Sequence, residues 1–135
     1  MRNDTQTIDI DVDPEAVTAF VADGANLPSW AIGFAKQVEP ATDGSWVVIT
    51  GSGDRIATRI DHDPARGTVD FVMSPASDVE VIAWTRSVPM GDATVFAFTQ
   101  VQAPEMPDTV FDAQVAAVHH ELIALKALLE VSCPR

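Results

Sequence analysis

The chain has 135 residues, of which 47% are hydrophobic, enough for one domain with a core and too many for a disordered chain. Its 20 acidic and 8 basic residues give a net charge of −12. Nucleic acids and anionic membranes are bound through basic patches, so we expect this acidic protein to bind neither. No apolar run approaches the roughly 20 residues of a membrane-spanning helix, so we expect no membrane insertion.

The N-terminus lacks the apolar stretch of a signal peptide, because Met1-Arg2-Asn3-Asp4 leads directly into strand-like sequence. We therefore expect a cytoplasmic protein. The single cysteine, Cys133, cannot form an internal disulfide, and it has no partners for a zinc site. We expect neither a metal site nor a cofactor.

The first third of the chain predicts one strand and two short helices. Alternating apolar and polar residues over Thr7–Val12 predict a half-buried strand. Asp13-Pro14-Glu15 then predicts a helix start, with an aspartate as cap, a proline at the first helical position and a glutamate at the positive end of the dipole. The segment from Asn26 to Trp30 predicts a turn into a second short helix, which Asn26 could cap.

The middle of the chain predicts six more strands, separated by turn residues. Strands that follow one another with short connections favour an antiparallel meander. The predicted strands are Phe34–Glu39, Trp46–Thr50, Arg55–His62, Thr68–Met73, Val79–Val88 and Thr94–Gln102.

The last part, Pro107 to Val131, predicts a long amphipathic helix of roughly 35 Å. Its apolar side chains recur at alternating steps of four and three and so share one face. A helix with one apolar stripe needs a broad apolar surface to pack on, and the strands can supply it. An antiparallel sheet with its helices on one side belongs to the α+β class. The stripe consists of Phe111, Val115, Val118, Leu122, Leu125 and Leu129.

Three segments carry a resemblance to a known family: the opening strand into Asp13–Val17, the stretch Phe20–Trp30, and Met106–Phe111 running into the long helix. With the order of elements, they resemble the START-related superfamily, also called SRPBCC, in its polyketide cyclase/dehydrase-like branch. The resemblance implies one helix-grip domain over residues 1–135, in which a curved sheet of about seven strands wraps around the C-terminal helix. It also implies a cavity between them for small apolar ligands. These motifs are structural, and no catalytic residue follows from them.

Several aromatic residues lie on the predicted sheet and on the short helix before it. Large rings near a few polar groups are typical of an apolar pocket, although the same rings could simply fill the core. The residues expected to line the cavity are Trp30, Phe34, Trp46, Trp84, Val118 and Leu122.

Four polar residues are the candidates for chemistry in that cavity: Arg59, His62, Asp70 and His119. A carboxylate or a histidine could transfer protons in an enzyme of the cyclase or dehydratase kind. Strand parity leaves their orientation open. If the isoleucines of 55–62 face inward, Arg59 faces solvent; if the arginines do, they mark a site for an anionic head group.

Two surfaces suggest a homodimer. The strand at 94–102 is apolar on both faces, so the side occupied by Phe96 and Phe98 could face inward or outward. The back of the long helix is rich in alanine, at positions 113, 116, 117, 124 and 127. Either surface could pack against a second copy.

The leading hypothesis is that the chain binds a small, mainly apolar ligand, lipid- or polyketide-like, between the sheet and the C-terminal helix. The first alternative is a polyketide cyclase/dehydratase-type enzyme that uses a cavity carboxylate or histidine. The second is a non-catalytic regulatory or structural homodimer.

Overall fold

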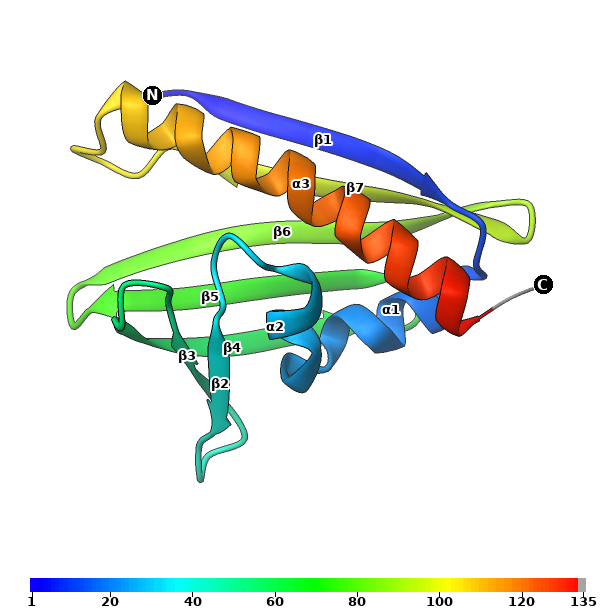
Figure 1. Ribbon diagram of the computed structural model, residues 1–135, viewed down its shortest axis with the longest axis horizontal. Coiled ribbons are helices and arrows are strands. Elements are labelled where there is room, and N and C mark those ends of the chain that lie inside the picture. The colour runs from blue at the N-terminus through cyan, green and yellow to red at the C-terminus, as the bar shows by residue number, and fades with distance from the viewer. Residues whose placement is uncertain (134–135) are drawn as a thin grey trace.

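The computed structural model describes residues 1–133 and contains one antiparallel sheet of seven strands (Figure 1). The strand order is β1-β7-β6-β5-β4-β3-β2, so β2 to β7 form a meander and β1 pairs with β7 at its edge. This is the predicted α+β helix-grip fold. In chain order the elements are β1 (Asn3–Ile10), α1 (Pro14–Ala22), a 3₁₀ turn η1 (Gly24–Asn26), α2 (Leu27–Trp30), β2 (Gln37–Pro40), β3 (Trp46–Ile49), β4 (Arg55–Asp63), β5 (Thr68–Ala76), β6 (Val79–Met90), β7 (Ala93–Val101) and α3 (Asp108–Ser132).

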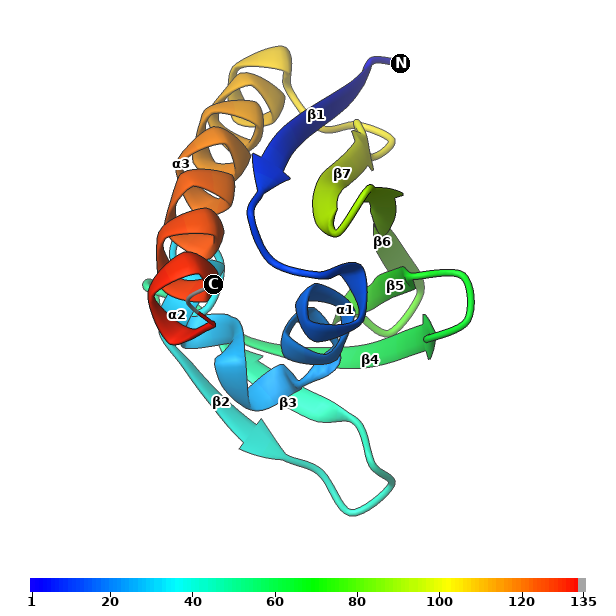
Figure 2. The same ribbon diagram turned by 90° about the vertical axis from the view of Figure 1, so that its right-hand side faces the viewer.

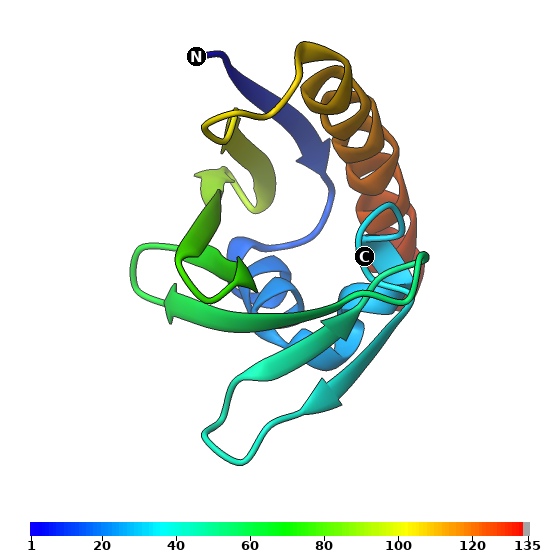
Figure 3. The same cartoon turned by 90° about the vertical axis from the view of Figure 1, so that its left-hand side faces the viewer.

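The sheet is strongly curved, and all three helices lie on its concave side (Figure 2). Helix α1 sits inside the curve against β5 and β6, where Val17 and Val21 are fully buried. Helix α3 closes the open side and runs beside β1. From the opposite end, α2 is seen next to α3 (Figure 3). Helices α1 and α2 thus lie on the same side of the sheet as α3.

Helix α3 is fixed to β1 along its length. At its start, Arg2 forms an ion pair of 2.7 Å with Asp112. In its middle, the Gln6 amide donates to the backbone oxygen of Val115 at 2.9 Å. Near its end, Lys126 donates to the backbone oxygen of Asp9 at 2.6 Å. The Arg2–Asp112 ion pair is exposed and adds little stability, so packing of the apolar stripe must hold the helix in place.

Five of the six side chains of that stripe are buried as predicted, and Val115 is partly buried. Phe111, Leu122, Leu125 and Leu129 are at most 3% exposed. The three leucines pack in one core cluster with residues from the start of the chain, such as Ile10. Burying one such side chain contributes about 1.5–3 kcal/mol, so the stripe is a principal source of stability.

The structure decides the orientations that parity left open. In β4 the side chains of Ile56 and Ile60 are partly buried on the concave face, and the two arginine side chains point to solvent. In β7, Phe96 and Phe98 face inward, while Ala97 is half-buried on the outer face. The two β4 arginines therefore cannot form a site for an anionic head group inside the cavity.

Two boundaries near the N-terminus differ from the prediction. Strand β1 begins at Asn3, because it pairs with β7 from Asn3 opposite Val101 to Ile10 opposite Thr94. Strand β2 begins only at Gln37, since the preceding residues form turns in which the Ala31 carbonyl accepts hydrogen bonds from the N–H groups of residues 34 and 35.

The helix caps were predicted in part. Asp13 caps α1 as expected, accepting a hydrogen bond of 3.0 Å from the Ala16 N–H. Asn26 precedes α2 but does not cap it. Its side-chain amide instead donates to the Phe20 carbonyl at 3.0 Å, which satisfies an acceptor near the end of α1.

Candidate functional site

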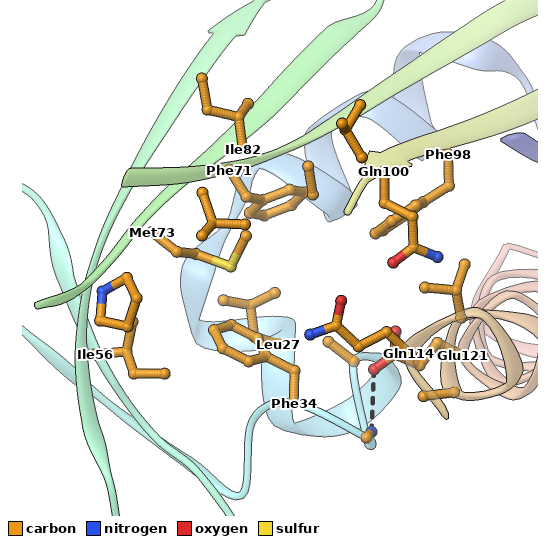
Figure 4. A pocket seen from close by; sticks show the side chains of 18 of the residues that line it. Leu27, Phe34, Ile56, Phe71, Met73, Ile82, Phe98, Gln100, Gln114 and Glu121 are labelled. Carbon is orange, nitrogen blue, oxygen red and sulfur yellow. Dashed lines mark hydrogen bonds between the residues drawn. The ribbon is translucent and has the colours of Figure 1, made fainter. Parts of the chain in front are cut away.

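A cavity of about 320 Å³ lies between the concave face of the sheet and α3 (Figure 4). The sheet contributes apolar walls from β4, β5, β6 and β7, including Phe71, Met73 and Phe98. Leu27 and Phe34 close it from α2 and the segment after it. The exposed Gln114 of α3 also borders the cavity, so the cavity meets solvent beside this helix. Such a mainly apolar hollow with a few polar groups is typical of small-molecule sites.

Glu121 is the most unusual residue in this wall. It belongs to α3, is only 5% exposed, and has a carboxyl group that borders an otherwise mainly apolar cavity. Its Oε2 accepts a hydrogen bond of 3.0 Å from the backbone N–H of Gly33 (Figure 4). Burial raises the pKa of Glu121 to about 7, and the hydrogen bond from Gly33 opposes that rise. Near neutral pH the carboxyl group therefore exists in both charge states.

The contact between Gly33 and α3 requires a residue without a side chain. A Cβ atom at position 33 would lie 2.9 Å from the Cβ of Ala117 and 3.4 Å from Oε2 of Glu121. Glycine thus lets the segment between α2 and β2 approach the helix closely enough for its N–H to reach the carboxylate. Ala117, which the sequence placed on the back of the helix, is part of this contact and borders the cavity.

Three further polar groups lie in the cavity wall. The Gln100 amide donates to Oδ2 of Asp4 at 3.3 Å and is buried. The Gln114 side chain makes no hydrogen bond with the described residues. The indole N–H of Trp30 is buried and finds no acceptor within residues 1–133. A buried donor without an acceptor costs free energy, so a ligand oxygen near Trp30 would be stabilising.

Three of the six residues expected in the walls border the cavity, namely Trp30, Phe34 and Val118. Leu122 lies in the adjoining core and is not part of the cavity surface. Trp46 also lies elsewhere, because its ring packs over Gly24, where a Cβ atom would collide with it.

Trp84 requires a correction. Its side chain is 39% exposed and lies on the outer face of the sheet, because the inward positions of β6 are occupied by the buried residues Ala83 and Thr85. Neighbouring side chains on a strand point to opposite faces, so Trp84 points away from the concave face.

The four polar candidates are all outside the cavity. Arg59 is exposed and pairs with Asp61 at 3.0 Å. His62 and His119 are exposed and do not border the cavity. Asp70 lies on the outer face beside Trp84, where partial burial, and then the nearby Asp61, raise its pKa. None of these side chains is placed to act on a molecule held against the concave face.

Glu121 was not among the residues predicted for the site, although the sequence contains one signal for it. It stands three residues after Val118 and four before Leu125, so it lies on the same helix face as the apolar stripe. A single acidic residue at such a position is usually a boundary residue reaching solvent. In the folded protein the side chain is buried, and Gly33 from a distant part of the chain donates a hydrogen bond to it.

The described residues contain no group of three or more His, Cys, Asp or Glu side chains that could hold a metal ion. Within the same residues, no helix is both long enough and apolar enough to cross a membrane.

Solved structures with the same fold are diverse in origin. The protein XoxI from Bacillus cereus superposes with a TM-score of 0.77 at 16% identity, covering 98% of this chain and 99% of that one. A START superfamily protein from Mycobacterium smegmatis gives a TM-score of 0.73 at 18% identity, covering 95% and 97% of the two chains. At such identities the likeness establishes the fold alone.

A third similar structure is the di-domain ARO/CYC BexL from the BE-7585A biosynthetic pathway, with a TM-score of 0.76 at 20% identity. The match covers 96% of this chain and 47% of that one, about half of its length. Among curated protein sequences, none matches this chain significantly. The sequence profile of the polyketide cyclase / dehydrase and lipid transport family matches residues 1–130. With this match over nearly the whole chain and a helix-grip fold around an apolar cavity, the protein belongs to the polyketide cyclase / dehydrase and lipid transport family.

Proposed function

We propose that this protein binds a small, mainly apolar molecule, lipid- or polyketide-like, in the cavity between the sheet and α3. The observation that carries the proposal is the cavity itself, about 320 Å³ and bordered mainly by apolar side chains. A void of this size lowers stability unless something fills it, because its lining loses packing contacts. Its volume is at the lower end of the range of small-molecule sites.

Affinity would come mainly from burial of apolar surface, at about 25 cal/mol per Å² before the costs of association. The aromatic rings of Phe71 and Phe98 both project from the sheet into the cavity and provide apolar surfaces for a ligand (Figure 4). Family membership supports this proposal, since the family includes lipid transport proteins.

The test is a titration with N-phenyl-1-naphthylamine, an uncharged probe whose fluorescence rises in apolar surroundings. The cavity-filling variant Ala83→Met places a larger side chain on the concave face, since Ala83 borders the cavity. Its matched control is Ala97→Met, which makes the same change on the outer face of the neighbouring strand. We expect saturable binding at one site, weakened about tenfold or more by Ala83→Met and unchanged by Ala97→Met. Equal affinities in both variants, or no binding by the unmodified protein, would reject the proposal.

One observation favours a second candidate function, an enzyme of the cyclase or dehydratase kind. The residues first considered for it lie outside the cavity, but Glu121 borders the cavity and has a pKa of about 7, which suits a general acid or base near neutral pH. In such an enzyme, Glu121→Gln would abolish turnover of an aromatic polyketide substrate and leave its binding intact.

The homodimer remains a prediction. The outer sheet face presents Trp84 with the half-buried Ala97 on the neighbouring strand, and a similar fold has been solved as the Aha1 dimer from Colwellia psychrerythraea, with a TM-score of 0.73 at 17% identity. Light scattering of the unmodified protein and of Trp84→Ser would test it, with a shift to monomer expected for the variant.

A further inference from the structure

The cavity has an uneven distribution of polar groups that restricts what it can hold. Among the described residues that border it, Glu121 is the one ionisable side chain. Strand β4 contributes Ile56 to the cavity wall and also carries two arginines, Arg55 and Arg59. Both lie on the opposite face of the sheet, where they pair with Glu39 and Asp61. A ligand carboxylate in the cavity would find no cation and would meet an acidic residue.

Glu121 has unused hydrogen-bonding capacity. A carboxylate has two oxygens, each able to accept more than one hydrogen bond, and only one bond is found here, from Gly33 to Oε2. Among residues 1–133 no cation pairs with this carboxyl group, and its pKa is set by burial and by the hydrogen bond from Gly33. His119 and His120, its neighbours on α3, are exposed to solvent. A donor on a bound molecule would therefore satisfy a group that the protein leaves only partly satisfied.

We propose that the molecule bound in this cavity is uncharged and carries a hydroxyl or phenol group, and that this group forms a hydrogen bond with the carboxyl group of Glu121. The inference rests on the proposed function, since it names the chemical class of ligand for the same cavity. The apolar body of the molecule lies between Phe71, Phe98 and Phe34, and the hydroxyl end lies toward α3.

The choice of a hydroxyl over a charged group follows from the two charge states of Glu121. A hydroxyl can donate to the carboxylate and accept from the protonated acid, so it fits both states. An ammonium group fits only the carboxylate, and its burial carries a further desolvation cost. A ligand carboxylate fits only the protonated acid. Binding of a hydroxyl ligand should thus change little across pH 6–8, whereas binding of either charged group should depend on pH.

The experiment uses four compounds with the same ring and nearly the same size: 2-methylnaphthalene, naphthalen-2-ylmethanol, naphthalen-2-ylmethylamine and 2-naphthoate. Each is titrated into the unmodified protein at pH 6 and pH 8, with isothermal titration calorimetry for affinity and the amide signal of Gly33 in NMR spectra for location. We expect the alcohol to bind about tenfold more tightly than 2-methylnaphthalene, as a hydrogen bond to a charged or partly charged group can provide. We also expect it to shift the Gly33 signal.

Two variants separate the roles of charge and hydrogen bonding. Glu121→Gln keeps an acceptor for Gly33 and an amide that can donate and accept, so the alcohol should retain its affinity within about threefold while the pH dependence of the amine and the naphthoate disappears. Glu121→Leu removes the polar group and should make the alcohol and 2-methylnaphthalene bind equally. Because the Gln variant is nearly isosteric, it decides the matter even if the Leu variant fails to fold.

The outcomes distinguish this inference from the proposed function. If 2-methylnaphthalene binds the unmodified protein as tightly as the alcohol, the cavity binds apolar molecules but the hydroxyl assignment is wrong. If the amine or the naphthoate binds most tightly, the ligand class is charged and the inference is also wrong. If none of the four binds, both the inference and the proposed function fail.

Discussion

The backbone N–H of Gly33 donates a hydrogen bond of 3.0 Å to Oε2 of Glu121, and this contact joins the segment after α2 to the middle of α3. The two residues are 88 positions apart in the chain. The contact fixes the one ionisable group that borders the cavity among the described residues, and it links the stability of the fold to the charge of that group.

The free energy of unfolding should fall as the pH rises from 4.5 to about 7, because of the raised pKa of Glu121. Its pKa in the folded protein, about 7, is above the ordinary value of 4.5, so between these pH values the folded chain keeps a proton that the unfolded chain loses. The stabilisation is complete below pH 4.5 and is lost as the pH rises to about 7. The rise in pKa corresponds to about 3 kcal/mol at most.

Glu121→Gln should therefore be more stable than the unmodified protein at pH 8, and the difference should shrink at pH 5. Urea unfolding at both pH values measures it. Glu80→Gln, an exposed substitution that also removes one negative charge, is the control for the effect of net charge. A Glu121→Gln difference that is the same at pH 5 and pH 8 would show that the carboxyl group titrates normally.

Gly33→Ala should destabilise the protein by forcing α2 away from α3, because the added methyl group would lie 2.9 Å from the Cβ of Ala117. We expect a loss of about 1–3 kcal/mol, typical of overpacking. Gly51→Ala is the control, since no atom lies within 4 Å of a Cβ atom there. Adding Ala117→Gly should recover part of the loss beyond its own helix cost of about 1 kcal/mol. Additive effects in thermal or urea unfolding would contradict the steric explanation.

Leu122→Asp should unfold the domain, because it buries an unpaired charge at a position that is 3% exposed. The neighbouring substitution Ile123→Asp is the control, since Ile123 lies on the same helix and is 50% exposed. Far-UV circular dichroism and NMR dispersion should show an unfolded Leu122→Asp and a native Ile123→Asp. A stable, folded Leu122→Asp would mean that packing of this stripe is not what holds α3.

Substitutions at the four polar positions first considered for catalysis should leave ligand binding unchanged. Arg59, His62 and His119 are exposed, and Asp70 faces outward, so none contacts the cavity. Alanine substitutions of each should bind N-phenyl-1-naphthylamine within about twofold of the unmodified protein, as distant surface changes do. A tenfold loss at any of them would reveal a second surface that takes part in binding.

The sequence alone determined the order and type of the elements. Period-3.6 spacing of Phe111, Leu122 and Leu125 predicted α3, and alternation predicted the strands, because these patterns reflect which faces must be buried whatever the partner is. The same helical spacing placed Val118 on the inward face of α3, where it borders the cavity. The cap at Asp13 was equally readable, since it depends on residues only three positions apart.

Only the tertiary structure decided which residues face the cavity and which polar group lies in it. The local sequence did not show which side chains of β6 face inward. Trp84 points outward because its neighbours Ala83 and Thr85 are the buried, inward-facing residues. Glu121 is buried where a segment 88 residues away approaches α3 closely through a glycine, whose N–H donates to its carboxyl group. Helical and strand periodicity act over a few residues, whereas burial and pKa depend on contacts between distant segments, which no local pattern contains.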